Sequence, residues 1–137
     1  MTATADDLQI AIEKVCFIID KAHEFDVKEA VADPDSGSNP TDDGMVSVLE
    51  DHGDDPVAFE LTSFINGLDE DEQIDLVALV WLGRGDETLD DWDELRAEAA
   101  RQHNSRTAAY LLGIPLLSDF LEEGLAKFDL TCEGVGA

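Results

Sequence analysis

The segment Ile74–Leu82 constrains the fold more than any other part of this sequence, because it is apolar on nearly every side of a helix. A helix of this kind is normally the buried centre of a domain, with other helices packed around it. The acidic run Asp69–Glu72 precedes it and contains a capping box, which is typical of a helix start. Gly83 and Gly85 follow and are expected to end the helix. We therefore predict a central helix over about residues 70–83.

Apolar residues spaced three and four apart predict further helices on both sides of the central one. No segment alternates with period two over a useful length, so we expect no sheet. The additional helices are expected over Asp6–Ala32, from Pro56 to Asn66, from the cap Thr88 to the region of His103, over Ser105–Leu112, and from Pro115 to Phe128. The sequence thus predicts an all-α fold, a single-domain bundle of about five or six helices around the central apolar helix.

One helical domain is expected to cover residues 1–137, a usual length for a single domain. The acidic stretch 33–43 contains two prolines and no basic residue, which predicts a mobile loop. The short apolar piece Met45–Leu49 is expected to form one or two helical turns. The tail 131–137 is expected to be frayed.

The net charge is −25, from 33 acidic and 8 basic residues. This balance disfavours direct binding to DNA or RNA, because there is no basic surface to neutralise phosphates. We favour a solvated acidic surface, as in a protein adapted to salt, where screening relieves the repulsion. A cation-binding surface and a surface that imitates nucleic acid to capture basic proteins are the two alternatives.

The two cysteines, Cys16 and Cys132, lie far apart in the sequence and belong to no CxxC or Cys/His cluster. Cys16 falls in an apolar run, where a buried free thiol is expected. The first residues carry neither a basic region nor a long apolar stretch, so no signal peptide is expected. The longest apolar run is too short to span a bilayer, so no membrane association is expected. We therefore predict a cytoplasmic protein with reduced thiols.

The usual catalytic and metal-binding motifs are not found in the sequence. An EF-hand loop counted from Asp86 would place Asp91 where glycine is needed and Ala97 where glutamate is needed. None of the three histidines lies in an HExxH motif or in the paired Glu-x-x-His motifs of di-iron bundles. Nucleophile elbows and phosphate-binding loops are also absent. We therefore assign no catalytic residue, no metal ligand and no cofactor.

The arginines are unevenly distributed along the chain. All four fall between Arg84 and Arg106, and both tryptophans and the only tyrosine lie nearby in sequence. In so acidic a protein, such a group is suited to recognise an anion or the carboxylates of a partner. We favour the alternative, in which the arginines pair with acids of neighbouring helices and stabilise the bundle. The candidate binding residues are Trp81, Arg84, Asp86, Trp92, Arg96 and Tyr110.

Two motifs in this half of the chain carry a resemblance to a known family. The first is LVALVWLGRGD at Leu76–Asp86, followed by Trp92, and the second is YLLGIPLLSDFLEEGL at Tyr110–Leu125. In this order they resemble a bacterial family of proteins of unknown function, the domain-of-unknown-function family numbered 3775. The similarity runs from the region of Asp55 to Leu125. The resemblance implies a small helical bacterial protein, and it implies no reaction, cofactor or catalytic residue.

The sequence favours a non-enzymatic interaction or accessory protein, because it combines a helical bundle and extreme charge with no catalytic motif. A first alternative is an acidic mimic of nucleic acid or a partner of a basic protein, whose affinity would fall as salt rises. A second alternative is a small-molecule-binding protein or an enzyme that uses the segment Trp81–Tyr110. The wide apolar stripe of the first helix also allows a homodimer.

Overall fold

A computed structural model describes residues 3–32, 56–85 and 87–132 of the chain. This part of the chain contains six α-helices, two short 3-10 helices and no strand, so the predicted all-α fold is confirmed. The α-helices are α1 (Ile12–Ala32), α3 (Pro56–Asn66), α4 (Glu70–Arg84), α5 (Trp92–Gln102), α6 (Thr107–Leu112) and α7 (Leu117–Lys127), and the 3-10 helices are η1 (Ala5–Asp7) and η3 (Leu89–Asp91).

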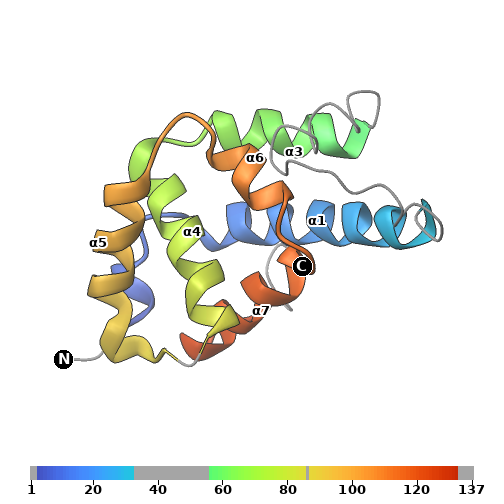
Figure 1. Ribbon diagram of the computed structural model, residues 1–137. Coiled ribbons are helices and arrows are strands. Elements are labelled where there is room, and N and C mark those ends of the chain that lie inside the picture. The colour runs from blue at the N-terminus through green and yellow to red at the C-terminus, as the bar shows by residue number, and fades with distance from the viewer. Residues whose placement is uncertain (1–2, 33–55, 86, 133–137) are drawn as a thin grey trace.

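Helix α4 lies at the centre of the bundle, as the apolar run predicted. In Figure 1 it stands between α5 on one side and α6 and α7 on the other, and it contacts all three. Helices α1 and α3 pack against each other, and they also contact α7 and α6, respectively. Leu76, Leu79 and Leu82 of α4 are fully buried, as are Leu61 of α3 and Ile18 of α1. The helices therefore share one contiguous hydrophobic core.

Two glycines allow the backbones of α4 and α7 to come close together. A Cβ atom built on Gly83 would lie 2.7 Å from the amide nitrogen of Gly124 and closer still to the carbonyl oxygen of Phe120. A Cβ atom built on Gly124 would in turn collide with the carbonyl oxygen of Leu79. The clashing atoms belong to the backbone, which cannot rotate away as a side chain can. The packing of α4 on α7 therefore requires glycine at both positions.

The boundaries of α4 follow the capping signals of the sequence with one exception. Oδ1 of Asp69 accepts a hydrogen bond from the backbone N–H of Glu72, and Oε1 of Glu72 accepts one from the backbone N–H of Asp69, each at 2.9 Å. Of the two glycines expected to end the helix, Gly85 is its C-cap as predicted, whereas Gly83 lies within the helix, which continues to Arg84. Gly83 serves the contact with α7 instead of a helix end.

Lys127 of α7 neutralises the C-terminal end of α4. Its ammonium group donates hydrogen bonds to the carbonyl oxygens of Leu82 (2.8 Å), Gly85 (3.3 Å) and Glu87 (2.8 Å). Carbonyl groups at a helix C-terminus lack partners within the helix, and a cation is favoured there by the helix dipole. Lys127 therefore fastens the end of α4 and the turn after it to α7.

The first helix begins later than predicted. The pair Asp6–Asp7 lies in η1 and does not cap α1, which begins at Ile12. The backbone N–H groups of Gln9 and Ile10 donate hydrogen bonds to Oδ2 of Asp75, at 3.1 Å for Ile10. These two N–H groups therefore bond to a side chain of α4 and not within a helix.

Asp75 is a buried acid within the apolar stretch Ile74–Leu82 of helix α4. It is fully buried, and its Oδ1 accepts a hydrogen bond from Nε of Arg96 at 2.5 Å. Arg96 also lies 3.8 Å from the exposed carboxylate of Asp71. Burial raises the pKa of Asp75 above its ordinary value, whereas the hydrogen bonds from Gln9 and Arg96 act to lower it. Arg96 therefore pairs with acids of a neighbouring helix, as the favoured interpretation expected of the arginines, whereas Arg101 pairs with Glu98 of its own helix.

Helix α7 also begins later than predicted, at Leu117 rather than at Pro115. Leu116 lies between them with a φ of 61°, which is the left-handed backbone conformation. A right-handed helix does not contain this conformation, so α7 starts only after Leu116. Helix α6 ends as predicted, with Gly113 as its C-cap.

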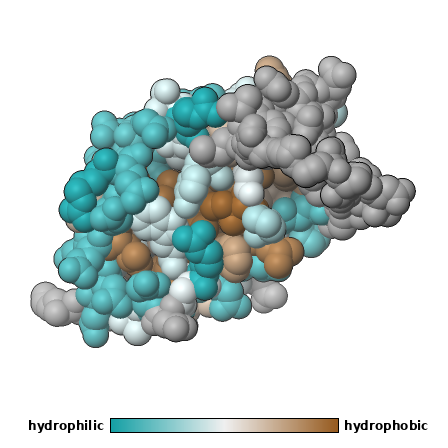
Figure 2. Space-filling model, viewed as in Figure 1, coloured by the Kyte–Doolittle hydropathy of each residue, from teal (hydrophilic) through white to brown (hydrophobic). Residues whose placement is uncertain are grey.

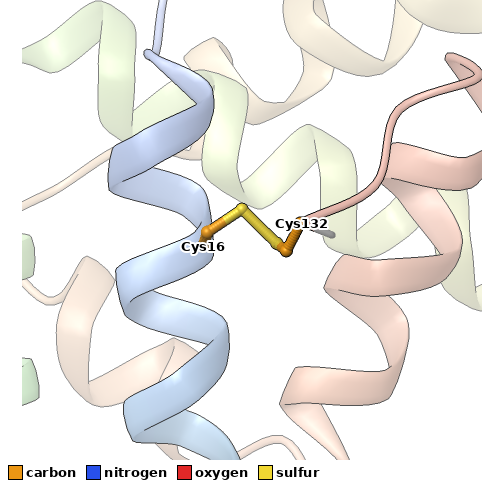
Figure 3. Close-up of a disulfide and its surroundings, with 2 residues drawn as sticks. All are labelled: Cys16 and Cys132. Atoms are coloured by element: carbon orange, nitrogen blue, oxygen red, sulfur yellow. A yellow bond between two sulfur atoms is a disulfide. The ribbon is translucent and has the colours of Figure 1, made fainter. Parts of the chain in front are cut away.

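Cys16 of α1 and Cys132 after α7 form a disulfide bond, so the prediction of free thiols is wrong (Figure 3). Their Cα atoms are 5.7 Å apart, which is a usual separation for bonded cysteines. The two residues are 116 positions apart in the sequence, and the pairing depends on how α1 and the segment after α7 pack together. The bond ties the end of the described chain to the first long helix.

We expect loss of this disulfide, by reduction or in a Cys16→Ala/Cys132→Ala double variant, to lower the free energy of unfolding by about 2–4 kcal/mol. The bond closes a long loop and thereby removes conformational entropy from the unfolded chain. Urea unfolding with and without dithiothreitol measures the change, and the double variant, which dithiothreitol cannot affect, is the control. A loss below about 0.5 kcal/mol would contradict a stabilising role.

Two predicted features lie outside the described residues, namely the loop at 33–43 and the helical turns at Met45–Leu49. Of the tail predicted to be frayed, 131–137, the described part includes Cys132, which the disulfide holds. In the part of the chain that the structure describes, no helix has the length and apolar character needed to cross a membrane.

Candidate binding pocket

A pocket opens between α4, the end of α5 and the start of α6. Its volume is about 220 Å³, which is below the range of pockets that hold drug-sized ligands. The lining residues are Gln73, Ile74, Val77 and Trp81 of α4, Ala99, Gln102 and His103 at the end of α5, and Asn104, Arg106, Thr107 and Tyr110 in and before α6.

One wall of the pocket is apolar and aromatic. Ile74, Val77 and Trp81 are spaced three and four residues apart, so they lie on one face of α4. The indole Nε1–H of Trp81 donates a hydrogen bond of 2.9 Å to the hydroxyl oxygen of Tyr110 on α6. This bond joins two half-buried aromatic rings from different helices and fixes their relative position.

Gln73 determines the orientation of His103 at the edge of the pocket. The amide Nε2 of Gln73 donates a hydrogen bond of 2.9 Å to the carbonyl oxygen of Ile65, which directs its Oε1 toward His103. Nε2 of His103 lies 2.7 Å from that oxygen, so this nitrogen carries the hydrogen that it donates. Nδ1 of His103 lies 3.8 Å from a carboxylate oxygen of Glu70. The imidazole is thus held between an amide and a carboxylate.

Asn104 shapes the turn that places Arg106 beside the pocket. Its Oδ1 accepts a hydrogen bond of 2.7 Å from the backbone N–H of Arg106, and its carbonyl oxygen accepts one of 3.2 Å from the Thr107 hydroxyl. Arg106 is the N-cap residue of α6 and is exposed at the pocket. Within the described ranges Arg106 forms no ion pair, whereas Arg96 and Arg101 each face a carboxylate.

Of the five predicted binding residues that the structure describes, Trp81 and Tyr110 line this pocket. Trp92 lies in the hydrophobic core, 1% exposed, with its ring edge-on to Phe128 and 4.9 Å between the ring centres. Trp92 is close to the other aromatic residues in the sequence. It lies on the apolar face of α5, and this face packs into the core.

The two predicted arginines also lie outside the pocket. Arg96 is bound to the buried Asp75, and Arg84 is exposed at the end of α4. Asp86 lies outside the described residues. The structure therefore does not gather the predicted set into one site.

Six polar lining residues were not among the predicted set: Gln73, Gln102, His103, Asn104, Arg106 and Thr107. His103 and Arg106 fall in the arginine-rich segment, but they were not among the predicted binding residues. Nothing in the sequence indicated a role for Gln73, because a glutamine on a helix is normally a solvated surface residue. Its position depends on Ile65 and His103, which come from two other helical segments.

The surface around the pocket is mixed in character. In the view of Figure 2, teal hydrophilic side chains cover α5, and paler and brown hydrophobic areas lie toward the middle of the face. Among residues 3–32, 56–85 and 87–132, no group of three histidine, cysteine, aspartate or glutamate side chains is placed to hold a metal ion.

Comparison with known proteins identifies one family. The family model described as "Protein of unknown function (DUF3775)" matches residues 58–130, which is just over half of the chain and includes the whole pocket. No curated protein and no solved structure matches the chain.

Proposed function

The chain belongs to the DUF3775 family, whose description assigns no activity, and we propose that it is a non-enzymatic binding protein that uses the α4–α5–α6 pocket. The observation that carries this proposal is the pocket itself, which joins an apolar wall to a small set of polar groups. Binding sites in proteins typically have this composition. The match to the family includes every residue of the pocket.

The hydrogen bonds around the pocket support its use as a preformed binding site. Nε2 of His103 is engaged by Gln73, and the Thr107 hydroxyl is engaged by the carbonyl of Asn104. The polar groups therefore hold one another in place, which preorganises the pocket for a ligand.

We test this proposal with neutral aromatic probes, benzyl alcohol and indole, and with the indole N–H signal of Trp81 in ¹H–¹⁵N spectra as readout. Both probes are expected to shift that signal, and the signal of the buried Trp92 is the internal reference. Ala99→Leu fills the pocket from α5 and is expected to abolish the shift. Ala97→Leu, an exposed position on the same helix, is the matched control and should retain it.

A second blocking variant, Val77→Phe, guards against a folding defect in Ala99→Leu, because it narrows the same pocket from α4. Unfolding midpoints show which variants are folded. If folded blocking variants respond to both probes as the wild-type chain does, the pocket is not the binding site.

A partner protein with a basic surface is a second candidate, supported by the net charge of −25. Glu87, Asp91, Glu94 and Glu98 also line an open groove on the side of η3 and α5. Electrostatic binding of this kind predicts an affinity that falls steeply with salt. A pull-down from cells of the source organism at low and high salt tests for such a partner. A complex whose yield does not change with salt would count against electrostatic binding.

Cytoplasmic location, bacterial origin and a homodimer remain predictions. The Cys16–Cys132 disulfide bears against a reducing compartment, since such bonds persist mainly where conditions are oxidising. Alkylation of thiols at the moment of cell lysis, followed by mass spectrometry, would show whether the bond exists in the cell.

The apolar stripe of α1 that motivated the predicted homodimer packs within the chain, because Val15, Ile18 and Ala22 are fully buried.

A further inference from the structure

We propose that the α4–α5–α6 pocket binds a compact apolar molecule that carries a carboxylate, with Arg106 and Tyr110 as the residues that recognise the carboxylate. This inference rests on the proposed binding function and specifies the class of ligand. It follows from the hydrogen-bonding groups that remain unused around the pocket, from the face on which they lie, and from the size of the pocket.

Most donor groups around the pocket are already engaged within the protein. The amide N–H groups of Gln73 face the carbonyl oxygens of Ile65 and Leu68, and the amide of Gln102 donates to Glu98. These side chains serve the protein's own structure. A ligand must therefore be recognised by the groups that are left.

Two of the groups that are left, on Tyr110 and Arg106, are hydrogen-bond donors. Tyr110 accepts a hydrogen bond from Trp81, so its own hydroxyl hydrogen is available to a ligand. The Arg106 guanidinium carries five N–H donors and no acceptor, and it has no carboxylate partner in the described part of the chain. Donors of this kind select an acceptor, and an arginine fork matches the two oxygens of a carboxylate.

Arg106 and Tyr110 are also placed to act on one group. They are four residues apart at the start of α6, and the backbone N–H of Tyr110 donates to the carbonyl of Arg106 at 2.9 Å. Residues four apart on a helix lie on the same face. The remaining wall, formed by Ile74, Val77 and Trp81, offers only apolar surface to the rest of the ligand.

The size of the pocket limits the apolar part of the ligand. A volume of about 220 Å³ is smaller than the pockets of about 300–1,000 Å³ that enclose drug-sized molecules. A single ring or a short branched chain is therefore the appropriate size. Phenylacetate has this size and charge, and phenylacetamide is a neutral molecule of nearly the same shape.

Titration of the full chain with phenylacetate and phenylacetamide tests the proposal, with the indole N–H signal of Trp81 as readout. Phenylacetate is expected to bind about tenfold more tightly than the amide, because the carboxylate gains a charge-assisted hydrogen bond. Arg106→Gln is expected to remove this preference, and Tyr110→Phe is expected to reduce it. Arg101→Gln changes the net charge equally but alters a residue that pairs with Glu98 outside the pocket, so it should keep the preference.

The outcomes separate this inference from the proposed function. Equal affinity for the two probes, or equal loss of preference in Arg106→Gln and Arg101→Gln, would overturn the carboxylate assignment and leave the pocket as a binding site. If neither phenylacetate, phenylacetamide nor the neutral probes move the Trp81 signal, both proposals fail. Arg106 is exposed, so its substitution should leave the unfolding midpoint unchanged, which the same samples verify.

Discussion

Gly83→Ala is expected to lower the free energy of unfolding by more than about 3 kcal/mol, because the added methyl group has no space between α4 and α7. Its Cβ would lie 2.7 Å from the amide nitrogen of Gly124 and even closer to the carbonyl oxygen of Phe120. Both obstacles are backbone atoms in the middle of a helix. The variant can fold only if α4 and α7 separate, and their separation would open the hydrophobic core.

Gly67→Ala is the matched control for this effect. A Cβ atom on Gly67 would lie 3.4 Å from the nearest atom, the carbonyl oxygen of Ser63, so the methyl group is nearly accommodated. We expect this variant to change the free energy of unfolding by less than about 1 kcal/mol. Urea unfolding followed by circular dichroism compares the two variants. Equal losses would show that the close contact of α4 and α7 does not determine the stability of the bundle.

Asp75→Ala is expected to lower the free energy of unfolding by about 3–5 kcal/mol, because it leaves buried donors without an acceptor. The carboxylate accepts hydrogen bonds from Gln9, Ile10 and Arg96, and it is fully buried. Its removal strands a partly buried guanidinium and two backbone N–H groups. It also releases the segment between η1 and α1, which these two N–H groups hold in place.

Asp71→Ala removes the other carboxylate near the same arginine and serves as the control. Asp71 is exposed and 3.8 Å from Arg96, so its loss should cost no more than about 1 kcal/mol. Amide hydrogen exchange provides an independent readout. Exchange at Gln9 and Ile10 should accelerate in Asp75→Ala and stay slow in Asp71→Ala. Unchanged protection at both amides in Asp75→Ala would contradict the role assigned to this carboxylate.

The helices could be predicted from the sequence because their signals are local. The apolar run at Ile74–Leu82 and the capping box of Asp69 depend only on residues within a few positions of each other. The end of α1 at Ala32 was predicted, but its start could not be predicted in this way, because the residues before it bond to Asp75, which lies far along the chain. The same holds for the disulfide, whose two cysteines are brought together only by the packing of α1 near the end of the chain.

The candidate site could be predicted only in part. The sequence correctly placed Trp81 and Tyr110 in one region, and their hydrogen bond joins two helices of the pocket. It could not distinguish the arginine that lines the pocket, Arg106, from Arg96, because both occur in the same segment. Arg96 is bound by the buried Asp75 of α4, whereas the turn at Asn104 places Arg106 beside the pocket.

The most direct test of the central claim is a backbone chemical-shift map of the full chain during titration with phenylacetate. The account predicts that the largest shifts fall at residues 73–81 of α4 and 99–110 of α5 and α6, the two segments that line the pocket. The groove lined by Glu87, Asp91, Glu94 and Glu98 should change little. Shifts concentrated in that groove, or spread evenly over the surface, would contradict a binding function of the pocket.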